Sequence, residues 1–155
     1  MNYTFKEAVA PNIDELKQHA ATKTNADIRL KAVDELGKWK CQQSVDILWH
    51  LMINDLVYEV QHEAFLRLQA FGENVRLPKK KKGNLIKQIN KKLEKILKPI
   101  EGQISFEQFI KLFEKQLPEA YDVCKHDKKG NFDKWLKNII GNFSSEIKSK
   151  ISNLQ

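Results

Sequence analysis

The sequence predicts an all-α fold, and three observations support that prediction. Apolar residues recur at intervals of three and four along most of the 155 residues, a spacing that places them on one face of a helix. No stretch alternates apolar and polar residues for long enough to indicate a strand. One block in the first half also repeats after 32 residues, with Ile28, Ala32 and Leu36 recurring as Val60, Ala64 and Leu68.

Four helices are expected in the first half of the chain. The first opens at Asn12, the second runs from about Asp27 to Leu36, the third covers Gln43 to Met52, and the fourth follows Asn54-Asp55 and ends at Gly72. Gly37 is expected in the left-handed conformation that often ends a helix. The apolar stripe of the third helix includes Trp49, and that of the fourth includes Phe65, so both rings are predicted to be buried.

The repeated block resembles the HEAT repeats of bacterial proteins, including the short type of phycobilin-lyase-like families. One copy is matched by Ile28, Arg29, Ala32, Leu36 and Gly37, and the next by Asp55, Val60, Ala64, Leu68 and Gly72. Gln61 departs from the pattern, because it stands where the family has arginine. The resemblance implies a right-handed stack of antiparallel helix pairs, an α-α superhelix whose surface contacts partners.

A change in charge divides the chain near Pro78. Residues 1–78 hold nine basic and eleven acidic side chains, whereas residues 79–155 hold eighteen basic and nine acidic ones. Four successive lysines follow the proline, a combination that disfavours helix at the boundary. We therefore predict HEAT-like repeats over 1–78 and a basic helical C-terminal region over 79–155, packed on the repeats in one continuous body.

The C-terminal region is predicted to be helical as well. Asn84 is expected to cap a helix reaching Leu97, and Ser105 and Gln108 have the spacing of a capping box. Pro118 suits the first turn of a further helix, which is predicted to end near Cys124. Apolar spacing predicts two more helices, one from about 132 to 141 with Trp135 buried and one over 144–155.

Groups that carry catalysis or bind metals are sparse. Glu59 and His62 stand three residues apart with no further ligand at a metal-binding spacing. We therefore interpret them as surface polar residues of a helix. Lys125 gives Cys124 a neighbouring cation, which can lower the thiol pKa and favour reactivity. We nevertheless predict an ordinary half-buried cysteine. The segment 127–138 lacks the glycine and glutamate positions of a calcium loop. We expect no enzymatic activity, no cofactor and no metal.

The predicted function is that of a non-enzymatic scaffold or interaction module that binds another protein. The candidate partner-binding residues are Trp39, Tyr58, Lys79, Lys80, Lys81, Lys82, Lys87 and Lys91. The alternative is nucleic-acid binding through the basic segment 79–98. Lysine supplies 24 of the 27 positive charges, so diffuse attraction is expected in place of arginine-mediated base readout. A small enzyme using Cys124 or His62 is a third alternative.

The sequence also bears on location. The N-terminus has no basic stretch followed by an apolar core, so no signal peptide is predicted. No apolar run approaches the roughly 20 residues that a membrane-spanning helix needs. A cytoplasmic protein is expected.

Overall fold

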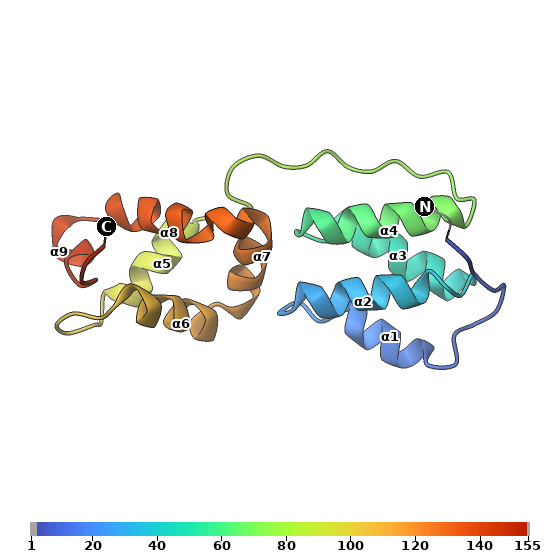
Figure 1. Ribbon diagram of the computed structural model, residues 1–155, viewed down its shortest axis with the longest axis horizontal. Coiled ribbons are helices and arrows are strands. Elements are labelled where there is room, and N and C mark those ends of the chain that lie inside the picture. Colours follow the sequence, from blue (N-terminus) through green and yellow to red (C-terminus); the bar gives the residue numbers. More distant parts are fainter. Residues whose placement is uncertain (1–2, 155) are drawn as a thin grey trace. The chain divides into compact units, whose positions relative to one another are not determined.

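The computed structural model describes residues 3–154, and this part of the chain is all-helical, which confirms the predicted fold class (Figure 1). The helices are α1 (Ile13–Ala20), α2 (Ala26–Leu36), α3 (Gln42–Asn54), α4 (Tyr58–Ala70), α5 (Ile89–Leu97), α6 (Phe106–Gln116), α7 (Pro118–Lys128), the 3-10 turn η1 (Lys129–Asn131), α8 (Phe132–Gly141) and α9 (Ser145–Lys148). They form two compact units, residues 1–81 (unit 1) and 82–155 (unit 2). The predicted packing of the second half on the first stays a prediction.

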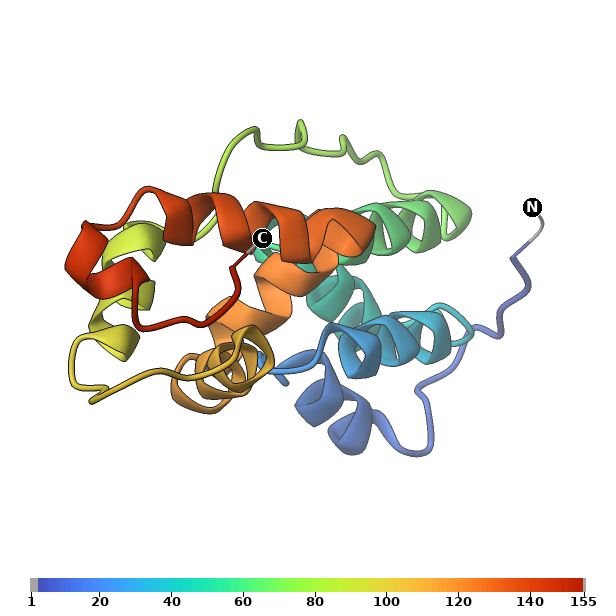
Figure 2. The ribbon, with the colours of Figure 1, turned by 60° about the vertical axis from the view of Figure 1, so that its left-hand side comes forward.

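Unit 1 consists of two helix pairs in contact. Helix α1 packs on α2 and α3 packs on α4, while α2 also contacts α4 and α1 contacts α3. Figures 1 and 2 show α2 and α4 running side by side. Ala32 on α2 and Ala64 on α4 are both fully buried. Their small side chains allow the helix backbones to approach closely.

The residues before α1 join unit 1 through backbone hydrogen bonds. The Lys6 amide donates to the Lys38 carbonyl at 2.9 Å, and the Lys40 amide donates to the Lys6 carbonyl at 2.7 Å. Nearby, the Phe5 ring meets the Phe71 ring edge-on, with centroids 5.1 Å apart. The N-terminal segment therefore ties the α2–α3 turn to the end of α4.

Gly37 ends α2, but the expected left-handed conformation is wrong. Its φ of −66° and ψ of −11° lie in the right-handed region. A Cβ atom at this position would lie 2.4 Å from Cδ of Arg67 on α4. A larger residue at this position would displace the Arg67 side chain, which lies against the end of α2. Gly72, in contrast, has the positive φ of 91° expected after a helix.

Unit 2 is organised around an aromatic core. The buried rings of α6 and α8 pack with the apolar faces of α5 and α7. Phe113 stacks on Phe132 at 6.2 Å and meets Tyr121 edge-on at 5.4 Å. An isolated bridge between Ile104 and Ile151 joins the segment before α6 to the segment after α9, and Figures 1 and 2 show α9 beside α5.

Three predicted boundaries in this half differ from the structure. Helix α5 begins at Ile89 instead of after Asn84, because Gln88 adopts a left-handed φ of 56° and the Asn84 side chain accepts a hydrogen bond from Trp135 Nε1. Helix α7 continues past Cys124 to Lys128. The last helix covers four residues, since the chain at Ile151 turns to bridge the segment before α6.

Candidate interaction surfaces

A buried ion pair links the two helix pairs of unit 1. Arg29 on α2 donates to both carboxylate oxygens of Asp55, at 2.8 and 3.1 Å, and to the Thr22 carbonyl at 2.9 Å. Asp55, which lies between α3 and α4, also accepts from the Val57 amide at 2.9 Å. Both charged side chains are only 5% exposed. This geometry indicates a structural connection, because bidentate contacts hold both groups inside the unit.

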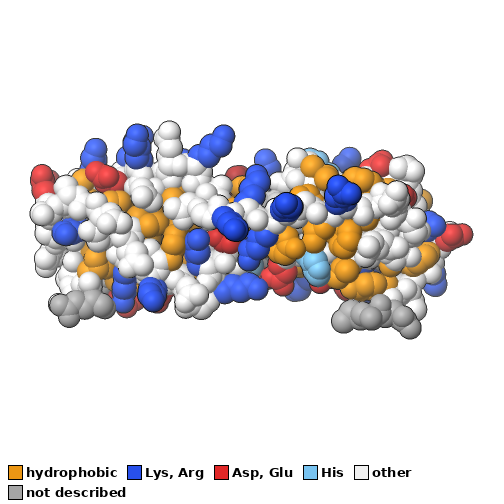
Figure 3. Space-filling view, turned by 90° about the horizontal axis from the view of Figure 1, so that it is seen from above, with side chains coloured by type: hydrophobic (Ala, Val, Ile, Leu, Met, Phe, Trp, Pro, Cys, Tyr) orange, Lys and Arg blue, Asp and Glu red, His pale blue; other side chains and the backbone are white. Residues whose placement is uncertain are grey.

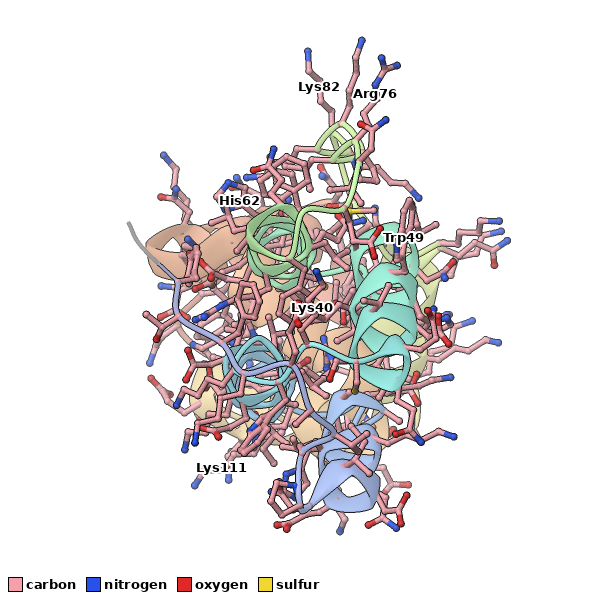
Figure 4. The ribbon with its side chains drawn as sticks, turned by 90° about the vertical axis from the view of Figure 1, so that its right-hand side faces the viewer. Lys40, Trp49, His62, Arg76, Lys82 and Lys111 are labelled. Atoms are coloured by element: carbon pink, nitrogen blue, oxygen red, sulfur yellow. The ribbon has the colours of Figure 1, made fainter. Side chains whose placement is uncertain are left out.

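Three large apolar side chains are exposed in the second half of α3 and just after its end. Trp49 is 36% exposed, Ile53 49% and Leu56 41%; we call these three residues the α3 patch. The predicted burial of Trp49 is therefore wrong. The buried face of α3 is formed by Leu48 and Met52 together with Leu51, so Trp49 lies at the edge of that face. Figure 4 labels Trp49 on the outer side of unit 1.

A second surface is a line of rings along α4. The Tyr58 ring stacks on the His62 ring with centroids 6.1 Å apart and planes 22° apart, and His62 is followed by Phe65 at 6.5 Å. We call these three residues the ring row. All three are half-buried, so the predicted burial of Phe65 is only partial. Figure 4 shows His62 on the side of α4 that faces away from α2.

The segment after α4 brings positive charge to the ring row. Lys80 Nζ lies 5.7 Å from the centroid of the Tyr58 ring, a distance at which an ammonium is attracted to the ring face. Lys79 and Lys81 are exposed on either side of it, as is Arg76 upstream. Figure 3 shows lysine and arginine side chains bordering hydrophobic and histidine side chains on this face of unit 1.

The predicted partner-binding residues are distributed over both units. Trp39 is half-buried beside the N-terminal segment, with Lys6 Nζ 5.8 Å from its ring. Tyr58 and Lys80 are in contact within unit 1, whereas Lys87 and Lys91 are exposed in unit 2. The prediction places His62 on the surface and Phe65 in the buried stripe, and it does not join them to Tyr58, although spacings of four and seven residues put all three on one side of a helix.

The two cysteines are free thiols with different surroundings. Cys124 is buried on α7, and its burial raises the pKa of its thiol to about 12, which keeps it protonated at neutral pH. Cys41 is half-buried and caps α3 by accepting from the Ser44 amide at 3.4 Å. Within residues 3–154, no three His, Cys, Asp or Glu side chains gather as metal ligands would.

Comparisons with known proteins found no match. No protein-family model matches the chain, and no curated protein or solved structure is significantly similar to it. Among the described residues, none of the helices combines the length and the apolar character needed to cross a bilayer.

Proposed function

We propose that this protein is a non-enzymatic interaction module in which unit 1, a HEAT-like stack of two antiparallel helix pairs, presents the α3 patch to another protein. The observation that supports this function is the exposure of Trp49, Ile53 and Leu56 within one short stretch of the chain, with Trp49 and Ile53 four residues apart on α3. Residues at this spacing share one side of a helix, and neighbouring exposed apolar side chains mark sites of protein contact.

The HEAT-like part of the proposal is supported by equivalent residues in the two pairs. Ala32 on α2 and Ala64 on α4 are both fully buried, and the two helices are in contact. Arg29 of the first pair bonds to Asp55 of the second. Gln61, at the position that matches Arg29, donates to the Met52 carbonyl at 2.9 Å instead. Arg29 thus joins the first pair to the second, as contacts between stacked repeats do, whereas Gln61 bonds within its own pair.

The composition of the α3 patch suits a protein partner. Tryptophan is enriched among the residues that contribute most to protein–protein binding. Two aliphatic side chains beside it add apolar area that water leaves when a partner binds. Neither free cysteine is placed for nucleophilic chemistry, because Cys124 is buried with a raised thiol pKa and Cys41 caps α3. Contact is therefore the function that this surface supports best.

The test is a substitution that places a charge in the α3 patch. Tagged wild-type protein, Ile53→Asp and the control Val9→Asp would be used to capture binding proteins from the native lysate. Val9 is also exposed, at 52%, but it lies in the N-terminal segment outside the patch. We expect bound proteins that Val9→Asp retains and Ile53→Asp loses, with unchanged helicity by circular dichroism. Equal recovery with both variants would contradict the proposal.

A second candidate function is nucleic-acid binding through the basic segment 79–98. It is supported by the exposure of its lysines and by the position of Lys80 over an aromatic ring. Lysines that neutralise phosphates release counterions, so affinity for nucleic acid should fall steeply as salt rises. Absence of binding to both duplex and single strands at low salt would exclude this candidate.

A further inference from the structure

We propose that the ring row of α4 and the lysines that follow it form a binding site for single-stranded nucleic acid. The proposal rests on the second candidate function, and it adds the type of strand and the residues that contact the bases. Tyr58, His62 and Phe65 would stack bases, while Lys79, Lys80 and Lys81 would pair with phosphates.

The first step of the argument is the shape of the ring row. Its three rings follow one another along one side of α4 with centroids 6.1 and 6.5 Å apart. Each is half-buried, so the helix holds it in place while part of the ring stays accessible. Rings of this kind stack unpaired bases with little regard to sequence, because every base has a π-face.

The second step is the placement of charge. Lys80 Nζ lies over the Tyr58 ring, 5.7 Å from its centroid, so its ammonium would move off the ring face to pair with a phosphate when a base stacks there. Lys79, Lys81 and Arg76 are exposed along the same extended segment, and Figure 4 shows Arg76 pointing away from the helices. One cation over the first ring, with further exposed cations on the same segment, suits a chain that carries both phosphates and bases.

The acidic residues of α4 narrow the choice of ligand. Glu59 is exposed next to Tyr58, and Glu63 is half-buried next to His62. These carboxylates would repel an anionic surface lying across the whole helix, so a membrane is disfavoured. An acidic peptide would pair with the lysines but would leave the rings unused. Duplex bases are already stacked on one another, so their π-faces are covered. A single strand makes use of both features.

The experiment measures binding of the full chain to fluorescein-labelled oligothymidylate, oligouridylate and a duplex of equal length by fluorescence anisotropy at low salt. Tyr58→Leu and Phe65→Leu retain apolar bulk but remove a ring. We expect each to weaken single-strand binding about tenfold, since loss of one stacked base is in that range. Lys80→Gln should weaken binding about threefold and reduce the salt dependence. The two single strands distinguish RNA from DNA as the preferred form.

Matched controls share the chemistry but lie elsewhere on unit 1. Trp49→Leu removes an exposed ring of the α3 patch, and Lys17→Gln removes an exposed lysine of α1. Both should bind single strands as wild type does. Circular dichroism melting of every variant separates a lost contact from a lost fold.

The possible outcomes are distinct. Salt-sensitive binding that Tyr58→Leu and Phe65→Leu leave unchanged, or equal affinity for duplex and single strand, would overturn the ring-row site while the second candidate function stands. Absence of binding to any nucleic acid would overturn both. Equal competition by polyglutamate, or tighter binding to phosphatidylserine vesicles than to single strands, would show a general anion site and overturn the proposal as well.

Discussion

The two units of this protein hold their helices together by different means. In unit 1, α2 and α4 are in contact and each carries a fully buried alanine, and the buried pair of Arg29 and Asp55 joins the two helix pairs. In unit 2, the contacts are made by large rings, of which Phe109 and Phe113 are fully buried. Unit 1 therefore depends on close approach and directional bonds, whereas unit 2 depends on apolar volume.

This difference determines what each unit tolerates. A charged pair inside a protein requires its exact partner, and loss of one member leaves the other buried without compensation. An aromatic core tolerates exchange between apolar groups of similar volume but not the loss of volume. Substitutions of each kind should therefore affect one unit and spare the other, and hydrogen exchange measured on peptides from each unit can separate the two effects.

The largest effect is expected from removing a central ring of unit 2. Phe113→Ala should lower the free energy of unfolding of this unit by about 4 kcal/mol, because the lost ring leaves a cavity against Tyr121 and Phe132. Chemical denaturation would give the magnitude, and faster hydrogen exchange should be confined to unit 2. Phe113→Leu serves as the control with a smaller loss. Equally faster hydrogen exchange in both units would contradict the view that the aromatic core stabilises unit 2 alone.

A slightly smaller effect is expected from removing the ion pair of unit 1. Asp55→Ala removes both carboxylate acceptors of the buried Arg29 guanidinium, which keeps its bond to the Thr22 carbonyl. Unit 1 should lose about 3 kcal/mol of stability, seen as faster exchange in α2 and α4. Asp46→Ala removes an exposed carboxylate of α3 and should change stability by less than about 0.5 kcal/mol. An effect no larger than that control would show that the pair does not join the helix pairs.

Local signals in the sequence predicted much of this architecture. The 32-residue repeat located α2 and α4 and their buried alanines, because helical spacing and small residues are visible without any tertiary information. The capping box at Ser105 was predicted for the same reason, and both of its hydrogen bonds are present. Features that depend on neighbours within about four residues were thus accessible.

Features set by distant residues were not predictable in the same way. Gly37 was assigned to a left-handed turn, but its close contact is with Arg67, thirty positions away in the chain. The predicted start of α5 at Asn84 lies too far toward the N-terminus, because the Asn84 side chain accepts a hydrogen bond from Trp135 and does not cap the helix. The exposure of Trp49 depends on which residues of α1 and α4 cover α3. The spacing of Tyr58, His62 and Phe65 places them on one side of α4, but it does not predict their exposure, because half-buried and buried rings have the same spacing.

The approach of α4 to Gly37 gives a more local test of close packing in unit 1. Gly37→Ala places a Cβ 2.4 Å from Cδ and 2.9 Å from Cγ of Arg67. Arg67 would have to shift away from Asp34 and from the Tyr3 ring that its guanidinium covers at 4.0 Å. We expect the free energy of unfolding of unit 1 to fall by about 2 kcal/mol, measured by chemical denaturation. Gly130→Ala, where the added Cβ meets nothing within 4 Å, is the matched control in unit 2.

The smallest change in stability is expected from removing one helix cap in each unit. Ser105 accepts from the Gln108 amide at 3.1 Å in unit 2, and Asn25 accepts from the Ile28 amide at 3.2 Å in unit 1. Each alanine substitution should cost about 1 kcal/mol, because a donor in the first helical turn loses its partner. The reason is the same in both units, so the magnitudes should agree although the cores differ.

Hydrogen exchange of α6 in Ser105→Ala and of α2 in Asn25→Ala would show whether each loss of stability is confined to the unit that carries the substitution. Ser105→Thr keeps a hydroxyl acceptor and should recover most of the stability of unit 2. A much larger loss for Asn25→Ala than for Ser105→Ala would indicate that unit 1 relies on its cap to position Arg29, one turn further along α2. The contrast between directional and volume-based packing would then extend from the helix contacts to the helix ends.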